Sequence, residues 1–253
     1  MNHIFLRQLP MWMAICVLLS CTKQKTAPGT ASLTLINAVP GSSPSLATNF
    51  GNDGPLNWYN SALQLVYGVW NANAQKGSYS GQQKLTIYHY PDTTAHSTPV
   101  FDLTLNLAVG TIHTLFLTGT MSAPDTLFTT DLLPYHPSTD SSLGIRFVNL
   151  QPGSAPVSIN ITGSANGSEV SSLAYKSITG FKNYPATSNI TGYNFEFRDA
   201  ATGTLIGNLN VNNINITDYN KRRFRNFTLA LLGLPGDPTT LKIILIENYT
   251  TTS

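Results

Sequence analysis

Residues 33–44 read LTLINAVPGSSP, and residues 145–156 read IRFVNLQPGSAP. The two stretches match at one constant offset, with Asn, Pro, Gly, Ser and Pro in the same places. In each copy an apolar run ends at an Asn, and a Pro-Gly-Ser-x-Pro turn follows. Gly41 and Gly153 are free to take a positive φ there, and the prolines fix φ on either side. A repeat of this size predicts two copies of one domain.

Further strand-like runs follow both copies. Residues 111–119 (TIHTLFLTG) resemble residues 225–233 (RNFTLALLG). Four more runs alternate between apolar and polar residues: Lys84–Tyr90, Phe101–Leu107, Tyr193–Arg198 and Leu205–Val211. Short strands separated by Gly, Pro and Asn turns, with at most a helical turn near Ser61–Tyr67, are typical of all-β sandwiches. We predict two tandem immunoglobulin-like β-sandwiches, at residues 32–139 and 140–253, with the boundary in the polar stretch 137–142.

The N-terminus has the pattern of a bacterial lipoprotein signal peptide over residues 1–20. Arg7 precedes an apolar run over residues 11–19, which is too short to span a bilayer. The sequence Leu-Leu-Ser then leads directly to Cys21, the expected point of lipid attachment. An uncleaved anchor or an ordinary secretory signal is the alternative, but Leu18 is bulky where an ordinary signal prefers a small residue. Residues 21–31 follow as a flexible tether.

Charge and cysteine content limit the classes of partner. Only 10% of the residues are charged and the formal net charge is +2, so no strong field favours nucleic acid. Cys16 would leave with the signal peptide, so the folded part would contain no disulfide. The expected partners are the membrane, through the lipid anchor, and an envelope protein or glycan. The predicted location is the cell envelope, at the outer membrane, on a face that the sequence leaves open.

The repeated landmarks also carry a family resemblance. Residues 146–149 with Pro152 match the opening Arg-Phe-x-Asn-x-x-Pro motif of the DUF4397 family, which this chain resembles over most of residues 32–250. The chain departs from that pattern at Thr34, which replaces the Arg, and at His113 and Asn226, where the family usually has Tyr. The resemblance implies a secreted or lipid-anchored bacterial protein with tandem immunoglobulin-like domains. It implies no established activity and no site residues.

A search for catalytic and metal-binding patterns yields no candidate. The histidines after the signal lack the short spacing of zinc motifs: His89, His96, His113 and His136. The acidic residues form no calcium loop, and the chain has neither a Gly-x-Ser-x-Gly elbow nor a phosphate loop. We therefore predict a protein that is not an enzyme, with no catalytic residue, no metal site and no cofactor.

One aromatic group offers a candidate binding site. Trp58, Tyr59, Tyr67 and Trp70 lie close together in a Gly- and Asn-rich stretch. Exposed rings beside amide side chains provide the apolar faces and directional hydrogen bonds that a sugar-binding platform needs. In the alternative interpretation, these rings cap the core of the first sandwich.

Two further patterns concern the surface. Lys221, Arg222, Arg223 and Arg225 form the only basic cluster, which we expect to be solvated at the start of a strand. Contact with a polyanion or a phospholipid headgroup is the alternative. The tripeptides at 92–94 and 125–127 resemble the Asp-Thr pattern of bacterial O-glycosylation.

The combined prediction is a noncatalytic, lipid-anchored cell-envelope protein that acts as a structural or interaction module. The alternative function is a glycan-binding envelope lipoprotein that uses the Trp58–Trp70 region.

Overall fold

The computed structural model describes residues 29–51, 62–92, 94, 96–216 and 222–248. This part of the chain is all-β apart from one 3-10 turn, η2, at Ala72–Ala74, which confirms the predicted fold class. None of its helices is long and apolar enough to cross a membrane. The strands of the first repeat are β1 (Thr30–Asn37), β2 (Ser45–Phe50), β3 (Gln64–Leu65), β4 (Gln75–Tyr79), β5 (Gly81–Tyr90), β6 (Phe101–Leu107), β7 (Ile112–Gly119) and β8 (Pro124–Thr130). Those of the second repeat are β9 (Ser142–Asn149), β10 (Val157–Ile161), β11 (Val170–Leu173), β12 (Lys182–Pro185), β13 (Gly192–Asp199), β14 (Leu205–Asn212), β15 (Asn226–Leu232) and β16 (Lys242–Asn248).

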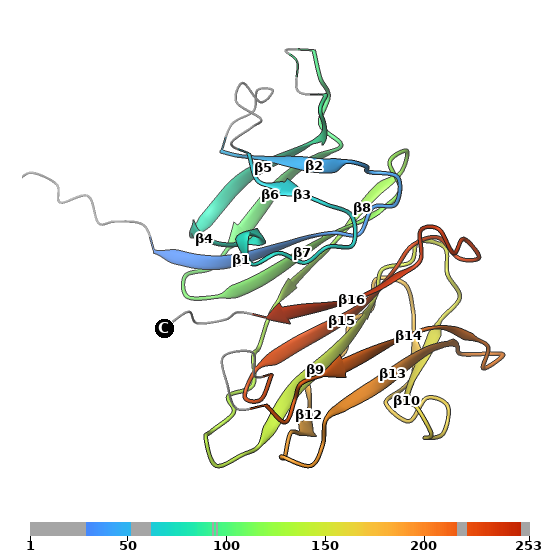
Figure 1. Cartoon of the computed structure of the whole chain (residues 1–253). Helices are drawn as coiled ribbons and strands as arrows, with labels where there is room; N and C mark the ends of the chain where they lie inside the picture. The colour runs from blue at the N-terminus through green and yellow to red at the C-terminus, as the bar shows by residue number, and fades with distance from the viewer. Residues whose placement is uncertain (1–28, 52–61, 93, 95, 217–221, 249–253) are drawn as a thin grey trace, which may run out of the picture.

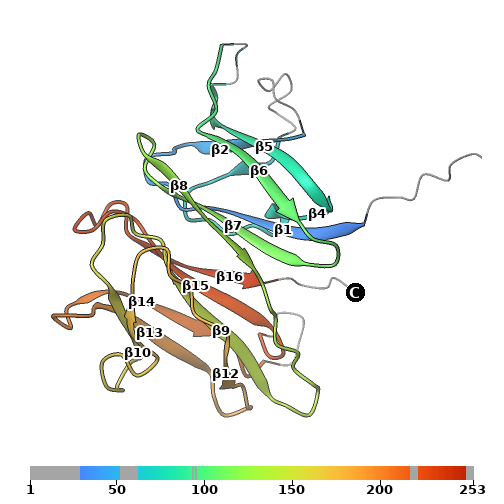
Figure 2. The same ribbon diagram turned by 180° about the vertical axis from the view of Figure 1, so that it is seen from behind.

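These strands form four sheets of four strands each. The first repeat contains β3-β2-β5-β6 and β4-β1-β7-β8, and the second contains β12-β9-β15-β16 and β11-β10-β13-β14. The four sheets lie one above another as layers, with the second repeat continuing the stack of the first (Figures 1 and 2). Both repeats have the same strand order, as the repeated sequence predicts.

One pairing in each repeat is parallel. β1 runs parallel to β7, and β9 runs parallel to β15, whereas the other pairs of named strands are antiparallel. The eight runs that the sequence marks as strands coincide with β1, β5, β6, β7, β9, β13, β14 and β15. The sequence leaves a helical turn open near Ser61–Tyr67, and the described residues 62–67 form no helix. Gln64 and Leu65 instead form edge strand β3, because they pair with Ala47 and Leu46 of β2.

The side chain of the repeated Asn holds each Pro-Gly-Ser turn in place through hydrogen bonds. Asn149 Nδ2 donates hydrogen bonds to Ser154 Oγ at 3.1 Å and to the carbonyl oxygen of Leu173 at 3.2 Å, while its Oδ1 accepts one from the backbone of Gln151 at 3.0 Å. Asn37 makes the same three kinds of contact in the first repeat. The motif thus ties the end of one strand to its own turn and to an edge strand of the opposite sheet.

A third apolar layer joins the two sandwiches. Each sandwich has its own core between its two sheets. In addition, the outer faces of β4-β1-β7-β8 and β12-β9-β15-β16 pack together through Ile36, Phe116, Val148 and Ala230, all of which are buried. The strands at this junction are therefore covered on both faces, which explains why β9 and β15 are buried along their whole length.

The predicted boundary between tether and sandwich needs correction. β1 begins at Thr30, so Thr30 and Ala31 belong to the first sandwich rather than to the tether. Ala31 is buried in the core because it lies on the same face of β1 as Leu33 and Leu35. The signal peptide, Cys21 and tether residues 22–28 lie outside the described residues.

Candidate functional site

The predicted aromatic group is only partly described. Trp58 and Tyr59 lie outside the described residues. Tyr67 and Trp70 are half-buried and pack against the apolar layer between the sandwiches. Trp70 Nε1 is buried and has no hydrogen-bond partner among the described residues. The two rings thus contact the junction rather than the core of the first sandwich.

Tyr67 links the first repeat to the loop between β15 and β16. Its hydroxyl donates a hydrogen bond to the carbonyl oxygen of Thr240 at 2.5 Å, and Lys242 Nζ donates one to the carbonyl oxygen of Tyr67 at 2.9 Å. The same ammonium lies 4.9 Å from the centre of the Tyr67 ring. Burial, assisted by the negative charge of Asp237, raises the pKa of Tyr67 to about 12. These contacts hold the ring in the junction.

A buried ion pair anchors the linker between the repeats. Arg146 Nη1 lies 2.8 Å from Asp131 Oδ1, and Arg146 Nε donates to Thr228 Oγ1 at 2.8 Å. Asp131 also accepts hydrogen bonds from the hydroxyls of Thr114 and Thr129. Arg146 of the second repeat therefore holds the start of the linker at the junction, and Thr34 stands at the matching position of the first repeat.

The fold brings together one histidine, one serine and one carboxylate from around the linker. His136 Nδ1 lies 2.9 Å from Ser142 Oγ, and His136 Nε2 lies 3.0 Å from Asn226 Oδ1. Ser142 Oγ donates its hydrogen to Asp140 at 2.8 Å. Both ring nitrogens are engaged and the serine hydroxyl points to the carboxylate, so this buried group fastens the linker to β9 and β15. Sequence reasoning missed the group because Asn226 is distant in the chain.

The other histidines and the basic cluster also have structural contacts. His113 stacks on Phe128 with the ring centres 4.8 Å apart. Arg225 Nη1 lies 2.6 Å from Glu247 Oε1, and Arg223 donates to the carbonyl oxygen of Asn215. Lys221 lies outside the described residues. Within the described part of the chain, no three His, Cys, Asp or Glu side chains are placed to hold a metal ion.

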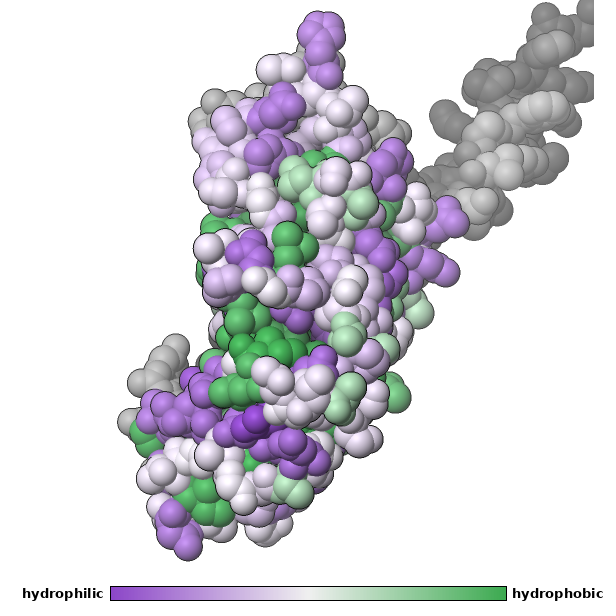
Figure 3. Space-filling model, turned by 90° about the vertical axis from the view of Figure 1, so that its right-hand side faces the viewer, coloured by the Kyte–Doolittle hydropathy of each residue, from purple (hydrophilic) through white to green (hydrophobic). Residues whose placement is uncertain are grey.

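The second sandwich has an apolar hollow at the end that carries its Pro-Gly-Ser turn. The hollow encloses about 500 Å³ between the β9–β10 turn, the β13–β14 turn and the β15–β16 loop. Leu205, Ile206, Leu234 and Leu241 contribute its apolar surface. Figure 3 views this end of the molecule and shows hydrophobic side chains gathered in a hollow in the lower half, with hydrophilic side chains around it.

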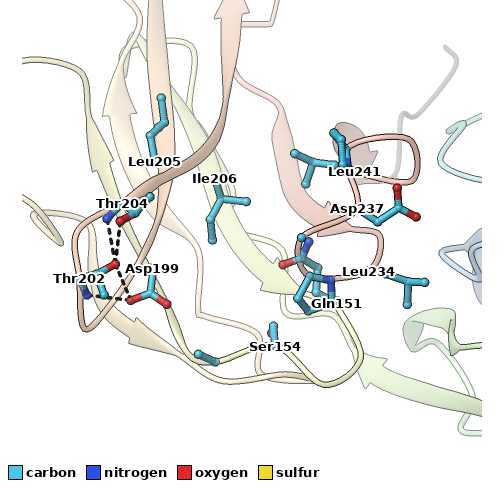
Figure 4. A pocket seen from close by; sticks show the side chains of 14 residues that line it. Gln151, Ser154, Asp199, Thr202, Thr204, Leu205, Ile206, Leu234, Asp237 and Leu241 are labelled. Atoms are coloured by element: carbon cyan, nitrogen blue, oxygen red, sulfur yellow. Dashed lines mark hydrogen bonds between the residues drawn. The ribbon is translucent and has the colours of Figure 1, made fainter.

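Two carboxylates border this hollow. Figure 4 shows Asp199 and Asp237 on opposite sides, with Ile206 between them. Hydrogen bonds from the backbone and hydroxyl of Thr202 lower the pKa of Asp199, and those from Thr239 lower the pKa of Asp237. Both groups are therefore ionised at neutral pH. The hollow combines an apolar floor with a negatively charged rim.

Comparisons with known proteins add little to this geometry. No family model and no curated protein matches the chain. Among solved structures, the chain is similar to a protein described as "Alpha-glucan binding by a streptococcal virulence factor", at 10% identity, a TM-score of 0.28, 87% coverage of this chain and 97% of that one. It is also similar to a family CBM26 module from Eubacterium rectale Amy13K in complex with maltoheptaose, at 11% identity, a TM-score of 0.24, 88% coverage of this chain and 98% of that one.

Proposed function

We propose that this chain is a lipid-anchored, noncatalytic protein of the cell envelope, of the DUF4397-like type, which presents a stacked pair of sandwiches for interaction with a partner. The observation that carries the proposal is the junction. The two repeats share a buried apolar layer, and the Arg146–Asp131 ion pair and the Tyr67–Thr240 hydrogen bond cross or border it. Such contacts favour one rigid unit over two independently moving domains.

The arrangement of the ends supports the same function. β1 begins at one side of the molecule, and the turn between β13 and β14, which borders the hollow, lies at the opposite side (Figures 1 and 2). With the flexible tether that the sequence predicts after Cys21, a lipid anchor would leave the apolar hollow accessible to a partner. Exposed apolar hollows with polar rims commonly mark interaction surfaces.

Mass spectrometry tests the anchor. Protein isolated from bacterial membranes should begin at an acylated Cys21, and the Cys21→Ser variant should leave the membrane fraction. A mature protein with a free N-terminus at another residue would refute the anchor.

Site-specific photo-crosslinking in cells tests the interaction surface. A photoreactive residue in place of Leu205, which is 46% exposed at the hollow, should give a discrete cross-linked species that disappears in the Cys21→Ser background. Val109 is 70% exposed in the turn between β6 and β7 and provides the control position. The same species from both positions, or none from position 205, would argue against the hollow as the interaction surface.

A further inference from the structure

The second repeat closes the edge of its sandwich with an aromatic plug. Tyr184 on β12 is 3% exposed, and its ring centre lies 5.5 Å from that of Tyr193 and 5.4 Å from that of Phe195. Its hydroxyl donates a hydrogen bond to Glu169 Oε2 at 2.5 Å, and Lys182 Nζ lies 2.7 Å from the same oxygen. A phenol ring and a lysine–carboxylate pair thus fill this edge.

The strand register identifies the residues of the first repeat at the same place. β4 pairs with β1 as β12 pairs with β9. The matched inward-facing pairs are Leu33–Lys76 and Ala31–Ser78 in the first repeat, and Ile145–Lys182 and Leu143–Tyr184 in the second. Lys76 therefore stands in the place of Lys182, and Ser78 stands in the place of Tyr184. Both repeats thus have a lysine at the first of these positions, but only the second repeat has an aromatic ring at the other.

In the opposite sheet, too, aromatic residues of the second repeat match non-aromatic residues of the first. The ladder between β2 and β5 ends at the pair Phe50–Leu85, and the ladder between β10 and β13 ends at the pair Ile161–Phe195. Gln83 lies two residues before Leu85, as Tyr193 lies two residues before Phe195. At the positions that match Tyr184, Tyr193 and Phe195 of the plug, the first repeat thus has Ser78, Gln83 and Leu85.

A cavity of about 790 Å³ occupies this edge of the first sandwich. Its lining includes Phe50, Lys76, Ser78, Tyr79 and Gln83. The volume lies in the range of small-molecule sites, about 300–1,000 Å³. Phe50 and Tyr79 are exposed at the cavity and offer two further rings for stacking.

We propose that this cavity binds a ligand that carries an aromatic ring next to an anionic group, the combination that the second repeat supplies from its own chain. The ring would occupy the space above Ser78 that corresponds to the Tyr184 ring, and the anion would meet Lys76. Within the described residues, no hydrogen bond or ion pair engages the Lys76 ammonium. The proposal goes beyond the proposed function, since it depends neither on the lipid anchor nor on the hollow of the second sandwich.

Titration of the purified protein with 4-hydroxyphenylacetate, followed by NMR or calorimetry, tests this site. The acid should bind, and the neutral 4-hydroxyphenylacetamide should bind about threefold more weakly, because a partly exposed charge pair contributes modestly. The tripeptide Gly-Gly-Tyr carries the same two groups at a chain end. Tighter binding of the tripeptide would identify a peptide as the source of the ligand, and tighter binding of the acid would identify a free metabolite.

Three variants separate an effect on ligand binding from an effect on folding. Ser78→Tyr rebuilds the plug and should reduce affinity for the acid at least tenfold, while Ser171→Tyr, an exposed position on β11, should leave it unchanged. Lys76→Gln should weaken the acid about threefold but leave the amide unaffected. The proposal is overturned if no probe binds at millimolar concentration, or if Ser78→Tyr folds and binds the acid as tightly as the natural chain.

Discussion

Arg146 Nη1 and Asp131 Oδ1 lie 2.8 Å apart, with side chains that are only 5% and 1% exposed. The two residues belong to different parts of the chain, since Arg146 is in β9 and Asp131 follows β8. The pair therefore fixes the linker against the second sandwich. Because both charges are removed from water, each depends on the other for compensation.

Replacing only one residue of the Arg146–Asp131 pair should lower the free energy of unfolding far more than replacing both. Arg146→Met leaves the Asp131 carboxylate buried without its cation and should lower the free energy of unfolding by about 3–5 kcal/mol. The double variant Arg146→Met, Asp131→Leu should recover most of that loss, because an apolar pair carries no desolvation cost. Urea unfolding of the three proteins measures the difference. A single variant as stable as the natural protein would show that the pair is dispensable.

The repeated Asn should contribute equally to the free energy of unfolding in both sandwiches. Asn37→Ala and Asn149→Ala each remove three hydrogen bonds at a buried turn and should each lower the free energy of unfolding by about 2–3 kcal/mol. Asn208 is exposed on β14, so Asn208→Ala is the matched control, with an expected change within about 0.5 kcal/mol. If Asn149→Ala behaves like the control, the motif does not stabilise the turn as its contacts indicate.

The elements that the sequence predicts well are those that repeat or alternate. The Asn-x-x-Pro-Gly-Ser motif predicts two equivalent turns, and Asn37 and Asn149 make equivalent contacts in them. β14 alternates between more and less exposed residues because one of its faces is exposed. Local patterns of this kind need no knowledge of the rest of the chain.

The sequence is less informative where distant segments meet. The parallel pairing of β1 with β7 leaves no local signal, and the junction depends on which faces of two sandwiches meet. β15 carries apolar residues at consecutive positions, Leu229 to Leu232, a pattern that predicts burial on both faces of the strand. Tyr67 is an example, since its hydrogen-bond partners Thr240 and Lys242 belong to the other repeat.

Glu196 should make stability depend on pH in acid. Hydrogen bonds from Asn160, Arg198 and Thr162 to its carboxylate lower the pKa of Glu196 from 4.5 to about 2. Because the folded state holds the charged form, its contribution to stability is complete above pH 4.5 and is lost as the pH falls toward about 2. Glu196→Gln should therefore destabilise the protein near neutral pH and match it in strong acid. Urea midpoints across this range test the sign, and a difference that grows on acidification would contradict it.

Variants at Trp70 distinguish a structural role at the junction from a role in glycan binding. Its ring packs against the apolar layer between the repeats, so Trp70→Ala should lower the free energy of unfolding by about 2 kcal/mol. Trp70→Phe keeps a ring and removes the buried Nε1–H that has no partner among the described residues, so it should cost less than about 1 kcal/mol. Tyr67→Phe loses the hydrogen bond to Thr240 and should cost about 1 kcal/mol. Urea unfolding and a glycan array on the same proteins separate the two roles. Lost glycan binding with unchanged stability in Trp70→Ala would favour the sugar platform, because a ring needed only for stacking on a ligand contributes nothing to the free protein.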